Sequence, residues 1–238
     1  MKRTSSIIVG MLFFVAADAQ NIVVHKSNGS VEKYASSKVE YIDFTAGVQG
    51  VDLGLPSGVK WANVNVGATS PEDFGDYFAW GETESKSEYS WRTYKWCNGS
   101  YKTLKKYCIS SEFGTVDNKK VLDPEDDVAH VKWGGSWRMP TYEEMAELKA
   151  NCIWELTKVN GVSGYKVTGP NGKSIFLPAA GYRYDSKLNQ VDVNSDYWTA
   201  SLNTGNSYRT WDFYFNSNSY EISGDNRYYG HSVRPVTK

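Results

Sequence analysis

Long apolar runs are absent from this sequence beyond its first twenty residues, and cysteine, histidine and proline are scarce. Structural zinc sites need four cysteine or histidine ligands at short spacing, and Cys97 and Cys108 with distant histidines do not supply them. The 26 basic and 27 acidic residues nearly cancel, so no charge excess attracts nucleic acid or an anionic membrane. These absences exclude a structural zinc domain and argue against a nucleic-acid-binding protein.

The first 19 residues have the pattern of a secretory signal peptide. Lys2 and Arg3 form a basic start, residues 7–16 are apolar, and Ala17-Asp18-Ala19 is a cleavage motif. The apolar run is too short to span a bilayer as an anchor. We therefore expect residues 1–19 to be removed and the protein to be exported, with no transmembrane segment after cleavage. An uncleaved membrane anchor is the alternative that these flanking residues disfavour.

Aromatic residues make up 15% of the chain and hydrophobic residues 40%, which is enough for a full core. We expect two parts after the signal peptide, a leader over residues 20–46 and a main domain over residues 50–238. In the leader, residues 22–25 and 31–34 flank a Ser-Asn-Gly-Ser turn and predict a hairpin, and residues 39–44 alternate as a third strand. So small a unit cannot form its own core, so we expect it to dock on the main domain or on a partner.

The first half of the main domain has weak secondary-structure signals. Residues 51–55 and 59–62 predict short strands, residues 71–75 one helical turn and residues 77–80 a buried strand. Residues 82–132 have no sustained periodicity, which is typical of a long surface loop and often of function.

One helix is clearly signalled, beginning after Thr141 and ending near Asn151. Thr141 and Glu144 have the spacing of a capping box, in which each side chain satisfies the backbone N–H of the other. Met145, Leu148 and Cys152 follow at three- and four-residue spacing and form one apolar stripe.

Strands dominate the remaining sequence. Residues 164–168 and 174–177 are joined through Gly-Pro-Asn-Gly and predict a hairpin. Residues 209–215 alternate between apolar and polar side chains, which predicts a half-buried antiparallel strand. The apolar positions of this strand are Trp211, Phe213 and Phe215, and the polar positions are Thr210, Asp212 and Tyr214.

Export permits a disulfide, and Cys97 with Cys108 is the pair we consider. The two residues enclose a ten-residue loop with Asn98-Gly99 as a turn. Cys152 fits the helix stripe as a small buried hydrophobic residue. The sequence leaves open whether the Cys97–Cys108 bridge forms.

Four motifs occur in a fixed order along the main domain. They are Gly-Gly-Ser-Trp-Arg-Met-Pro-Thr-x-x-Glu at 134–144, Leu-Pro-Ala-Ala-Gly-Tyr-Arg at 177–183, Tyr-Trp-Thr-Ala-Ser at 197–201 and Gly-His-Ser-Val-Arg-Pro-Val at 230–236. Over roughly residues 50–236 the chain resembles the Fibrobacter succinogenes major paralogous domain family, exported proteins of gut Bacteroidota. That family looks related to the C-type-lectin-like fold in its formylglycine-generating-enzyme form.

The resemblance implies an α+β fold, with a twisted antiparallel sheet, one main helix and long ordered loops, preceded here by a small N-terminal β appendage. It implies no activity and no cofactor. Formylglycine-generating enzymes use a redox cysteine pair in the C-terminal part of the domain. No cysteine follows Cys152 in this chain, so that chemistry is not carried over.

The motifs also contain residues that we expect to be structural. A buried arginine needs a carboxylate or carbonyl partner, and Glu82 and Asp76 are the carboxylates that we expect to serve. The predicted structural residues are Trp137, Arg138, Thr141, Glu144, Arg183 and Arg234.

Neither catalysis nor metal binding has a strong signal. The histidines His25, His130 and His231 accompany no nucleophile-elbow sequence, so a structural role is favoured for each. One acidic cluster offers the hard oxygen ligands that Ca²⁺ prefers, but its spacing matches no EF-hand, and the Glu-Pro-Asn tripeptide of C-type lectins is missing. A solvated acidic loop is therefore the favoured interpretation. The calcium candidates are Asp123, Glu125, Asp126 and Asp127.

Residues 189–231 have the composition of a binding surface, because more than half of them are Asn, Asp, Ser or Tyr. Tyrosine supplies contact area at low entropy cost, and the small polar residues supply adaptable hydrogen bonds. The alternative is an exposed β-rich surface with ordinary turn residues. The predicted binding residues are Tyr197, Trp198, Tyr208, Arg209, Tyr214, Tyr220, Arg227, Tyr228 and Tyr229.

The sequence thus predicts an exported, non-enzymatic protein that binds a glycan or a protein on a cell surface through these late residues. Two alternatives stay open. An enzyme on this scaffold would be favoured by a deep pocket lined by acids with shifted pKa values or by paired thiols. A structural component of a surface assembly would be favoured by an unpaired strand edge in the leader.

Overall fold

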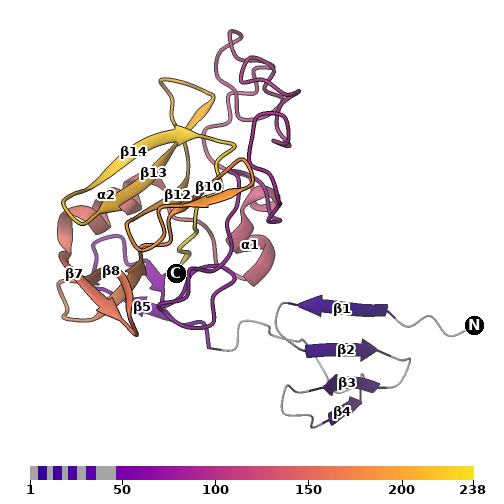
Figure 1. Ribbon diagram of the computed structural model, residues 1–238, viewed down its shortest axis with the longest axis vertical. Helices are drawn as coiled ribbons and strands as arrows, with labels where there is room; N and C mark the ends of the chain where they lie inside the picture. Colours follow the sequence, from indigo (N-terminus) through magenta and orange to yellow (C-terminus); the bar gives the residue numbers. More distant parts are fainter. Residues whose placement is uncertain (1–4, 10–12, 18–20, 26–30, 36–46) are drawn as a thin grey trace, which may run out of the picture. The chain divides into compact units, whose positions relative to one another are not determined.

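The computed structural model describes residues 5–9, 13–17, 21–25, 31–35 and 47–238 (Figure 1). The chain divides into two compact units, residues 1–46 and residues 47–238. None of the helices in the described ranges has the length and apolarity needed to cross a membrane.

The described residues of the first unit form four antiparallel strands in chain order: β1 (Ser5–Val9), β2 (Phe13–Ala17), β3 (Asn21–His25) and β4 (Val31–Ala35). The predicted leader hairpin is confirmed, because β3 pairs with β4. Strands β1 and β2 occupy the segment that the sequence predicts to be a signal peptide, which stays a prediction. The third leader strand, predicted at 39–44, lies outside the described residues.

The second unit is mostly antiparallel β-sheet with two α-helices (Figure 1). Its helices are α1 (Val128–Trp133) and α2 (Tyr142–Asn151), and a short 3₁₀ turn, η2 (Pro124–Asp126), precedes α1. Its strands are β5 (Gly50–Asp52), β6 (Lys60–Ala62), β7 (Ile153–Val159), β8 (Val162–Thr168), β9 (Ser174–Pro178), β10 (Tyr182–Tyr184), β11 (Lys187–Asn189), β12 (Asn194–Leu202), β13 (Arg209–Asn216), β14 (Tyr220–Asn226) and β15 (Val236–Thr237).

These strands form four small sheets. Strand β6 lies between β5 and β15, so the two ends of the unit pair with each other. The other sheets have the orders β7-β8-β9, β10-β11 and β12-β13-β14. The three-stranded sheet β12–β14 packs its apolar face on α2 and on β8 and β9, forming the main core.

Some predicted elements are wrong. Residues 71–75 form a turn rather than a helical turn, and residues 77–80 are buried but form only an isolated bridge, between Phe78 and His231. Several elements were not predicted: α1, β7, η2, β10, β11, β12, β14 and β15. Helix α1 begins after Asp127, whose carboxylate accepts hydrogen bonds from two backbone N–H groups of its first turn. Strand β7 has no clear alternation of buried and exposed side chains, because its apolar residues Ile153 and Leu156 are exposed.

The predicted helix is confirmed as α2, including its capping box. The Thr141 hydroxyl accepts a hydrogen bond from the Glu144 N–H at 3.3 Å, and Glu144 Oε2 accepts one from the Thr141 N–H at 2.9 Å. Met145 and Leu148 are buried. Cys152 lies half-buried at the C-cap, and burial raises the pKa of its thiol to about 11.

We expect Thr141→Ala to lower the free energy of unfolding by about 1 kcal/mol, because the first turn of α2 loses a side-chain acceptor. Urea denaturation of the two proteins measures the difference. The Thr141→Ser variant keeps the hydroxyl, so its free energy of unfolding should fall clearly less. Equal losses in both variants would contradict a capping role.

The sequence left the Cys97–Cys108 disulfide open, and in the structure both cysteines are free thiols. Both thiols are buried in a second cluster of aromatic residues under the long loop, and each donates to a carbonyl. The Cys97 thiol lies 3.1 Å from the Trp91 oxygen, and the Cys108 thiol lies 3.1 Å from the Ser110 oxygen. Each cysteine therefore packs as a small buried residue.

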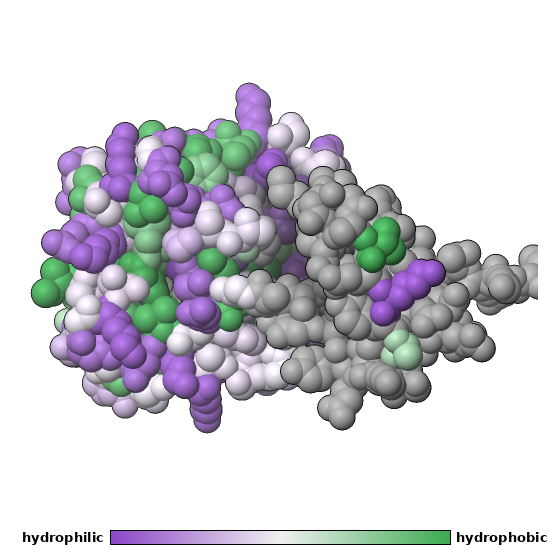
Figure 2. All heavy atoms as spheres, turned by 90° about the horizontal axis from the view of Figure 1, so that it is seen from below, coloured by the Kyte–Doolittle hydropathy of each residue, from purple (hydrophilic) through white to green (hydrophobic). Residues whose placement is uncertain are grey.

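Hydrophobic and hydrophilic residues are interleaved on the face of the molecule seen in Figure 2. Among the described residues, the most exposed large hydrophobic side chains are Ile153, Val193 and Leu156. They come from β7 and from the turn before β12.

Candidate functional site

The strands β12–β14 place a row of polar side chains on one face of their sheet. Asp196 lies opposite Tyr214, and Asp212 lies opposite Ser223. Side chains alternate along a strand and cross-strand pairs share a face, so all four point to the same side. By the same register, Asp225 also belongs to this face, because it lies two residues after Ser223.

The sequence predicted this polar face, but not that it would be covered. Residues 228–232, which we call the covering segment, run alongside β12. The Ser232 N–H donates to the Asp196 carbonyl, and the Trp198 N–H donates to the Ser232 carbonyl. His231 also exchanges two backbone hydrogen bonds with Phe78. Its ring stacks on the Trp198 indole with 3.9 Å between ring centroids. The covering segment therefore buries the acids that the alternation predicted to face solvent.

Two motif glycines allow other close contacts near this face, with Asn189 and with Tyr89. Gly181 has a φ of +64°, and a Cβ there would lie 2.0 Å from the Asn189 oxygen. At Gly230 a Cβ would lie 2.5 Å from a ring carbon of Tyr89. Only glycine fits at these positions, which precede Tyr182 and His231 directly.

A pocket of about 430 Å³ opens on this face, within the size range of small-molecule sites. Its lining is rich in carboxylates, amides and tyrosines and contains no lysine or arginine. The lining residues are Tyr182, Gln190, Asn194, Asp196, Asp212, Tyr214, Glu221, Ser223, Gly224, Asp225 and Tyr229.

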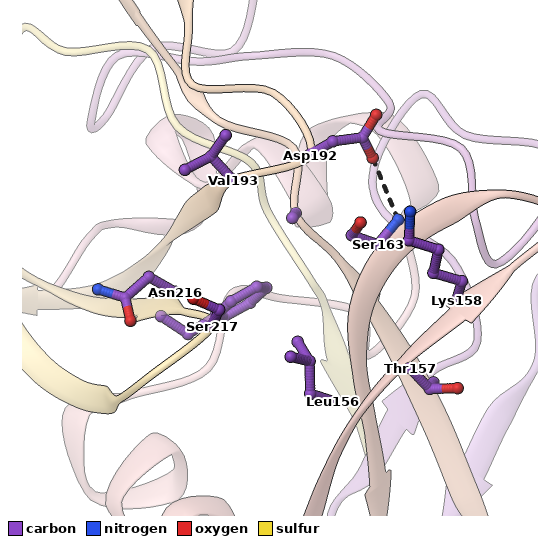
Figure 3. Close-up of a pocket in the computed structure, with 10 residues that line it drawn as sticks. Leu156, Thr157, Lys158, Ser163, Asp192, Val193, Asn216 and Ser217 are labelled. Carbon is purple, nitrogen blue, oxygen red and sulfur yellow. Dashed lines mark hydrogen bonds between the residues drawn. The ribbon is translucent and has the colours of Figure 1, made fainter.

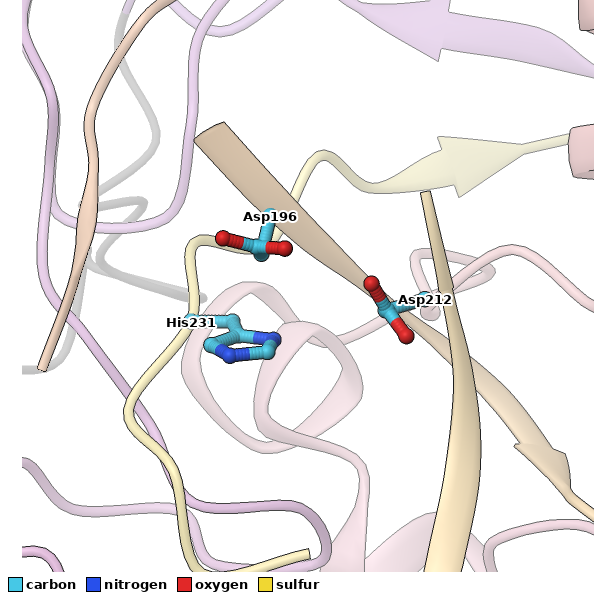
Figure 4. Close-up of side chains that lie close together, drawn as sticks. All are labelled: Asp196, Asp212 and His231. Atoms are coloured by element: carbon cyan, nitrogen blue, oxygen red, sulfur yellow. The ribbon is translucent and has the colours of Figure 1, made fainter. Parts of the chain in front are cut away.

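Three side chains converge beside the pocket: Asp196 from β12, Asp212 from β13 and His231 from the covering segment (Figure 4). One potential ligand atom from each lies within 4.8 Å of the other two. Asp212 is 1% exposed and His231 is fully buried. Within the described part of the chain, Asp212 Oδ1 and both ring nitrogens of His231 make no hydrogen bond. Asp225 Oδ2 lies 3.6 Å from His231 Nε2.

The electrostatics of this group follow from burial. Removal from water is the main cause that raises the pKa of Asp196 and of Asp212. Asp225 raises the pKa of Asp196 further, whereas a hydrogen bond with Asp212 lowers it. The charges of Asp196 and Asp225 raise the pKa of Asp212 further. Burial also raises the pKa of Asp225, to about 6. Burial lowers the pKa of His231 well below its usual value, so its ring is neutral at physiological pH. No ion pair with lysine or arginine is formed by Asp196 or Asp212 in the described residues.

Four of the nine predicted binding residues are buried, so these four cannot contact a ligand at the surface. Tyr197 belongs to the main core, Trp198 lies under His231, and Tyr228 is covered by neighbouring rings. Arg227 is fully buried and donates hydrogen bonds inside the protein. The aromatic composition of this region serves packing as much as recognition.

The other five predicted residues lie in different places. Tyr214 and Tyr229 line the pocket. Tyr208 packs against rings of the long loop, Tyr220 stacks on an indole of β7, and Arg209 is exposed. The structure therefore brings only two of the nine predicted residues together at the pocket. It also places four residues at this site that the sequence did not indicate as a group: Asp196, Asp212, Asp225 and His231.

The acidic cluster considered for calcium is occupied by lysine side chains. Lys106 Nζ lies 2.6 Å from a carboxylate oxygen of Asp123 and of Asp126 and 3.6 Å from Glu125. Two further lysines also pair with the cluster. Asp127 instead caps α1 and accepts a hydrogen bond from the Met139 N–H. This neutralisation disfavours a calcium site.

The predicted structural arginines are held by partners other than those expected. Arg138 pairs with Glu144 through two hydrogen bonds of 2.7 and 2.5 Å. Buried Arg234 donates to Asn65 and to two backbone carbonyls. Arg183 lies over the ring of Tyr77. The expected partner Glu82 pairs with a lysine instead, and Asp76 pairs with none of the three.

Trp137 packs edge-on against the indole of Trp133, the last residue of α1.

Two other pockets lack such chemistry. One of about 280 Å³ lies between β7 and β13 and is largely apolar (Figure 3). Its one acid, Asp192, accepts a hydrogen bond from the Ser163 N–H at 3.1 Å. Another, of about 360 Å³, contains Asp127 and His130, but the Asp127 carboxylate is satisfied by backbone donors.

The fold and site together define a protein of mostly antiparallel β-sheets with two helices and a polar pocket on one face of its C-terminal sheet. No family model matches the chain, and no curated protein or solved structure matches it either.

Proposed function

We propose that this chain is an exported, non-catalytic binding protein with a C-type-lectin-like fold, and that it recognises neutral glycans in the pocket on β12–β14. The observation that carries the proposal is the pocket lining, in which carboxylate and amide groups face the same space as tyrosine rings. Export is supported by the N-terminal pattern of a signal peptide.

The lining favours a glycan over the other ligands considered. Sugar hydroxyls donate to carboxylates and amides, and their C–H faces stack on aromatic rings. The absence of lysine and arginine from the lining disfavours an anionic ligand. A concave site of this volume suits a small ring system, whereas protein partners need a larger, flatter patch.

We expect the full-length protein to bind neutral oligosaccharides on a glycan array, and Tyr229→Ala to weaken binding at least tenfold. Removing this half-buried pocket ring costs stacking area, and tenfold corresponds to about 1.4 kcal/mol. Tyr208→Ala is the matched control, because Tyr208 lies outside the pocket lining and should leave the affinity unchanged. Calorimetry with the best array hit measures both. An equal loss in the two variants would move the site away from the pocket.

An acid–base enzyme acting on glycosidic bonds is a second candidate. The observation that favours it is the pair of adjacent buried carboxylates, Asp196 and Asp212, at the pocket. Glycosidases use two carboxyl groups about 5 Å or more apart, whereas here one oxygen of each lies within 4.8 Å of the other, so catalysis would need them to separate. Incubating the bound oligosaccharide with the protein and measuring chain length separates the candidates. Intact sugar supports binding alone, and cleavage that disappears in both Asp196→Asn and Asp212→Asn supports the enzyme.

A further inference from the structure

We propose that Asp196, Asp212 and His231 form a binding site for a divalent transition-metal ion of the zinc class, which opens to the pocket. The three residues come from β12, β13 and the covering segment. The side chains converge in Figure 4, and one atom of each lies within 4.8 Å of the others. This inference goes beyond glycan binding and does not depend on it.

Hydrogen bonding provides independent support. Buried polar groups are satisfied in nearly all native proteins, and each exception calls for an explanation. Here the fully buried imidazole of His231 has two nitrogens without a partner, and one oxygen of the buried Asp212 is also unpaired. All three atoms belong to the converging side chains. A bound cation would give Asp212 and one ring nitrogen a partner.

The contrast with the lysine-filled cluster supports the same assignment. At Asp123 and Asp126 the ammonium group of Lys106 supplies the balancing charge, at 2.6 Å from each carboxylate. The Asp196 and Asp212 carboxylates have no such lysine or arginine partner among the described residues. Among the described residues no lysine or arginine balances this cluster, so an external cation would supply the partner that its carboxyl groups lack.

The ligand types indicate the class of ion. A neutral imidazole with carboxylates suits zinc and its neighbours, whereas calcium and magnesium prefer oxygen ligands throughout. Three protein ligands with a fourth position left open are typical of zinc sites that bind a further molecule. Ligand atoms around tetrahedral zinc are about 3.4 Å apart, given bonds of about 2.0–2.1 Å, so modest side-chain rotations would bring these atoms into place. The pocket, which both carboxylates line, provides the open side.

Zinc binding is tested directly on the full-length protein after chelator treatment and dialysis. We expect calorimetric titration with zinc chloride to show one ion per chain with micromolar or tighter affinity. Asp212→Asn, which preserves shape but removes the charge, should weaken binding at least tenfold. His231→Phe, which keeps a ring on Trp198, should do the same. Cobalt(II) absorption spectra then report whether the bound ion has tetrahedral coordination.

The control is Asp123→Asn in the lysine-filled cluster, which should leave zinc affinity unchanged. Circular dichroism checks that each variant is folded. If His231→Phe is not folded, Asp212→Asn alone tests the proposal. No zinc binding by the unmodified protein would overturn the proposal, as would binding that Asp123→Asn weakens and Asp212→Asn does not. Binding of calcium but not of zinc would overturn the assignment of the ion. Zinc binding without glycan binding would leave the metal site standing and remove the proposed function.

Discussion

Replacing Arg227 with methionine is expected to lower the free energy of unfolding by about 4 kcal/mol or more, which is a large part of a typical domain's stability. The guanidinium is fully buried and donates four hydrogen bonds. Its acceptors are the Tyr94 hydroxyl and the carbonyls of Lys106, Tyr107 and Ser207, at 2.8–3.1 Å. Each acceptor left unsatisfied in the interior costs about 1–3 kcal/mol.

The effect is expected to be large because Arg227 joins segments that have little regular structure of their own. Its guanidinium lies 4.9 Å from the centroid of the Trp80 ring, and its acceptors belong to the long loop and to the turn before β13. The loop has isolated backbone hydrogen bonds but no regular strand, so side-chain contacts such as those of Arg227 add to its stability. Methionine fills similar space but supplies no donor.

Thermal and urea denaturation measure this loss, and a fall in melting temperature of roughly 10 °C is expected for a domain of this size. Arg209→Met is the matched control: it removes the same charge from an exposed position, so its effect should stay within about 0.5 kcal/mol. If both variants lose the same free energy of unfolding, the loss of net charge explains the effect of Arg227→Met, and the buried hydrogen bonds do not.

The elements that sequence could predict are those whose signals are local. The capping box at Thr141 and Glu144 needs only residues three apart, and the structure reproduces both of its hydrogen bonds. The alternation in residues 209–215 likewise predicted which side chains of β13 share a face. Helix α1 had a local signal as well, since Asp127 stands at the N-cap, and that signal was read only as part of an acidic loop.

The polar pocket could not be predicted because it depends on contacts between distant segments. Alternation placed Asp212 on the polar face of β13, but only the return of residues 228–232 along β12 covers that face. A residue-type signal was nevertheless present. Aspartate is disfavoured in strands, yet Asp196, Asp212 and Asp225 all stand within them. Acids at such positions deserve to be read as site candidates from the sequence alone.

The composition of residues 189–231 led to an incorrect choice for four of the binding residues. Tyrosine-rich, serine-rich segments are typical of binding loops, and all of the predicted rings come from residues 189–231. Tyr197 faces the main core and Tyr228 packs on Trp91 because both lie where segments converge. Tyrosine serves these positions by donating its hydroxyl inside the protein, as Tyr197 does to the Pro178 carbonyl at 2.9 Å. Composition therefore identified the region but not the residues.

We expect Asp212→Asn to make the metal-free protein more stable at neutral pH. In the folded protein the pKa of this carboxyl is raised, chiefly by burial and then by Asp196 and Asp225. Between the ordinary aspartate pKa of about 4 and the raised value, the folded state binds more protons than the unfolded state. Stability therefore falls as pH rises through this range, by up to about 1.4 kcal/mol per pH unit for each proton involved.

Asparagine has the same shape but does not ionise, so the variant should lose part of this pH dependence. We expect its melting temperature to exceed that of the unmodified protein at pH 7 and to approach it near pH 4. Denaturation at several pH values, with a chelator present, measures both curves. The control is Asp117→Asn, since the Asp117 carboxylate accepts three backbone N–H groups and its loss should destabilise the protein.

A gain in stability from removing a buried acid would show that Asp212 is retained for a reason other than folding, because a purely structural carboxylate stabilises the fold that holds it. Added zinc should then reverse the order of the two proteins, since an ion that binds the folded state adds stability only where its ligands are intact. If Asp212→Asn is instead destabilising at neutral pH and zinc changes nothing, the cluster is structural, and the ion site proposed at Asp196, Asp212 and His231 is wrong.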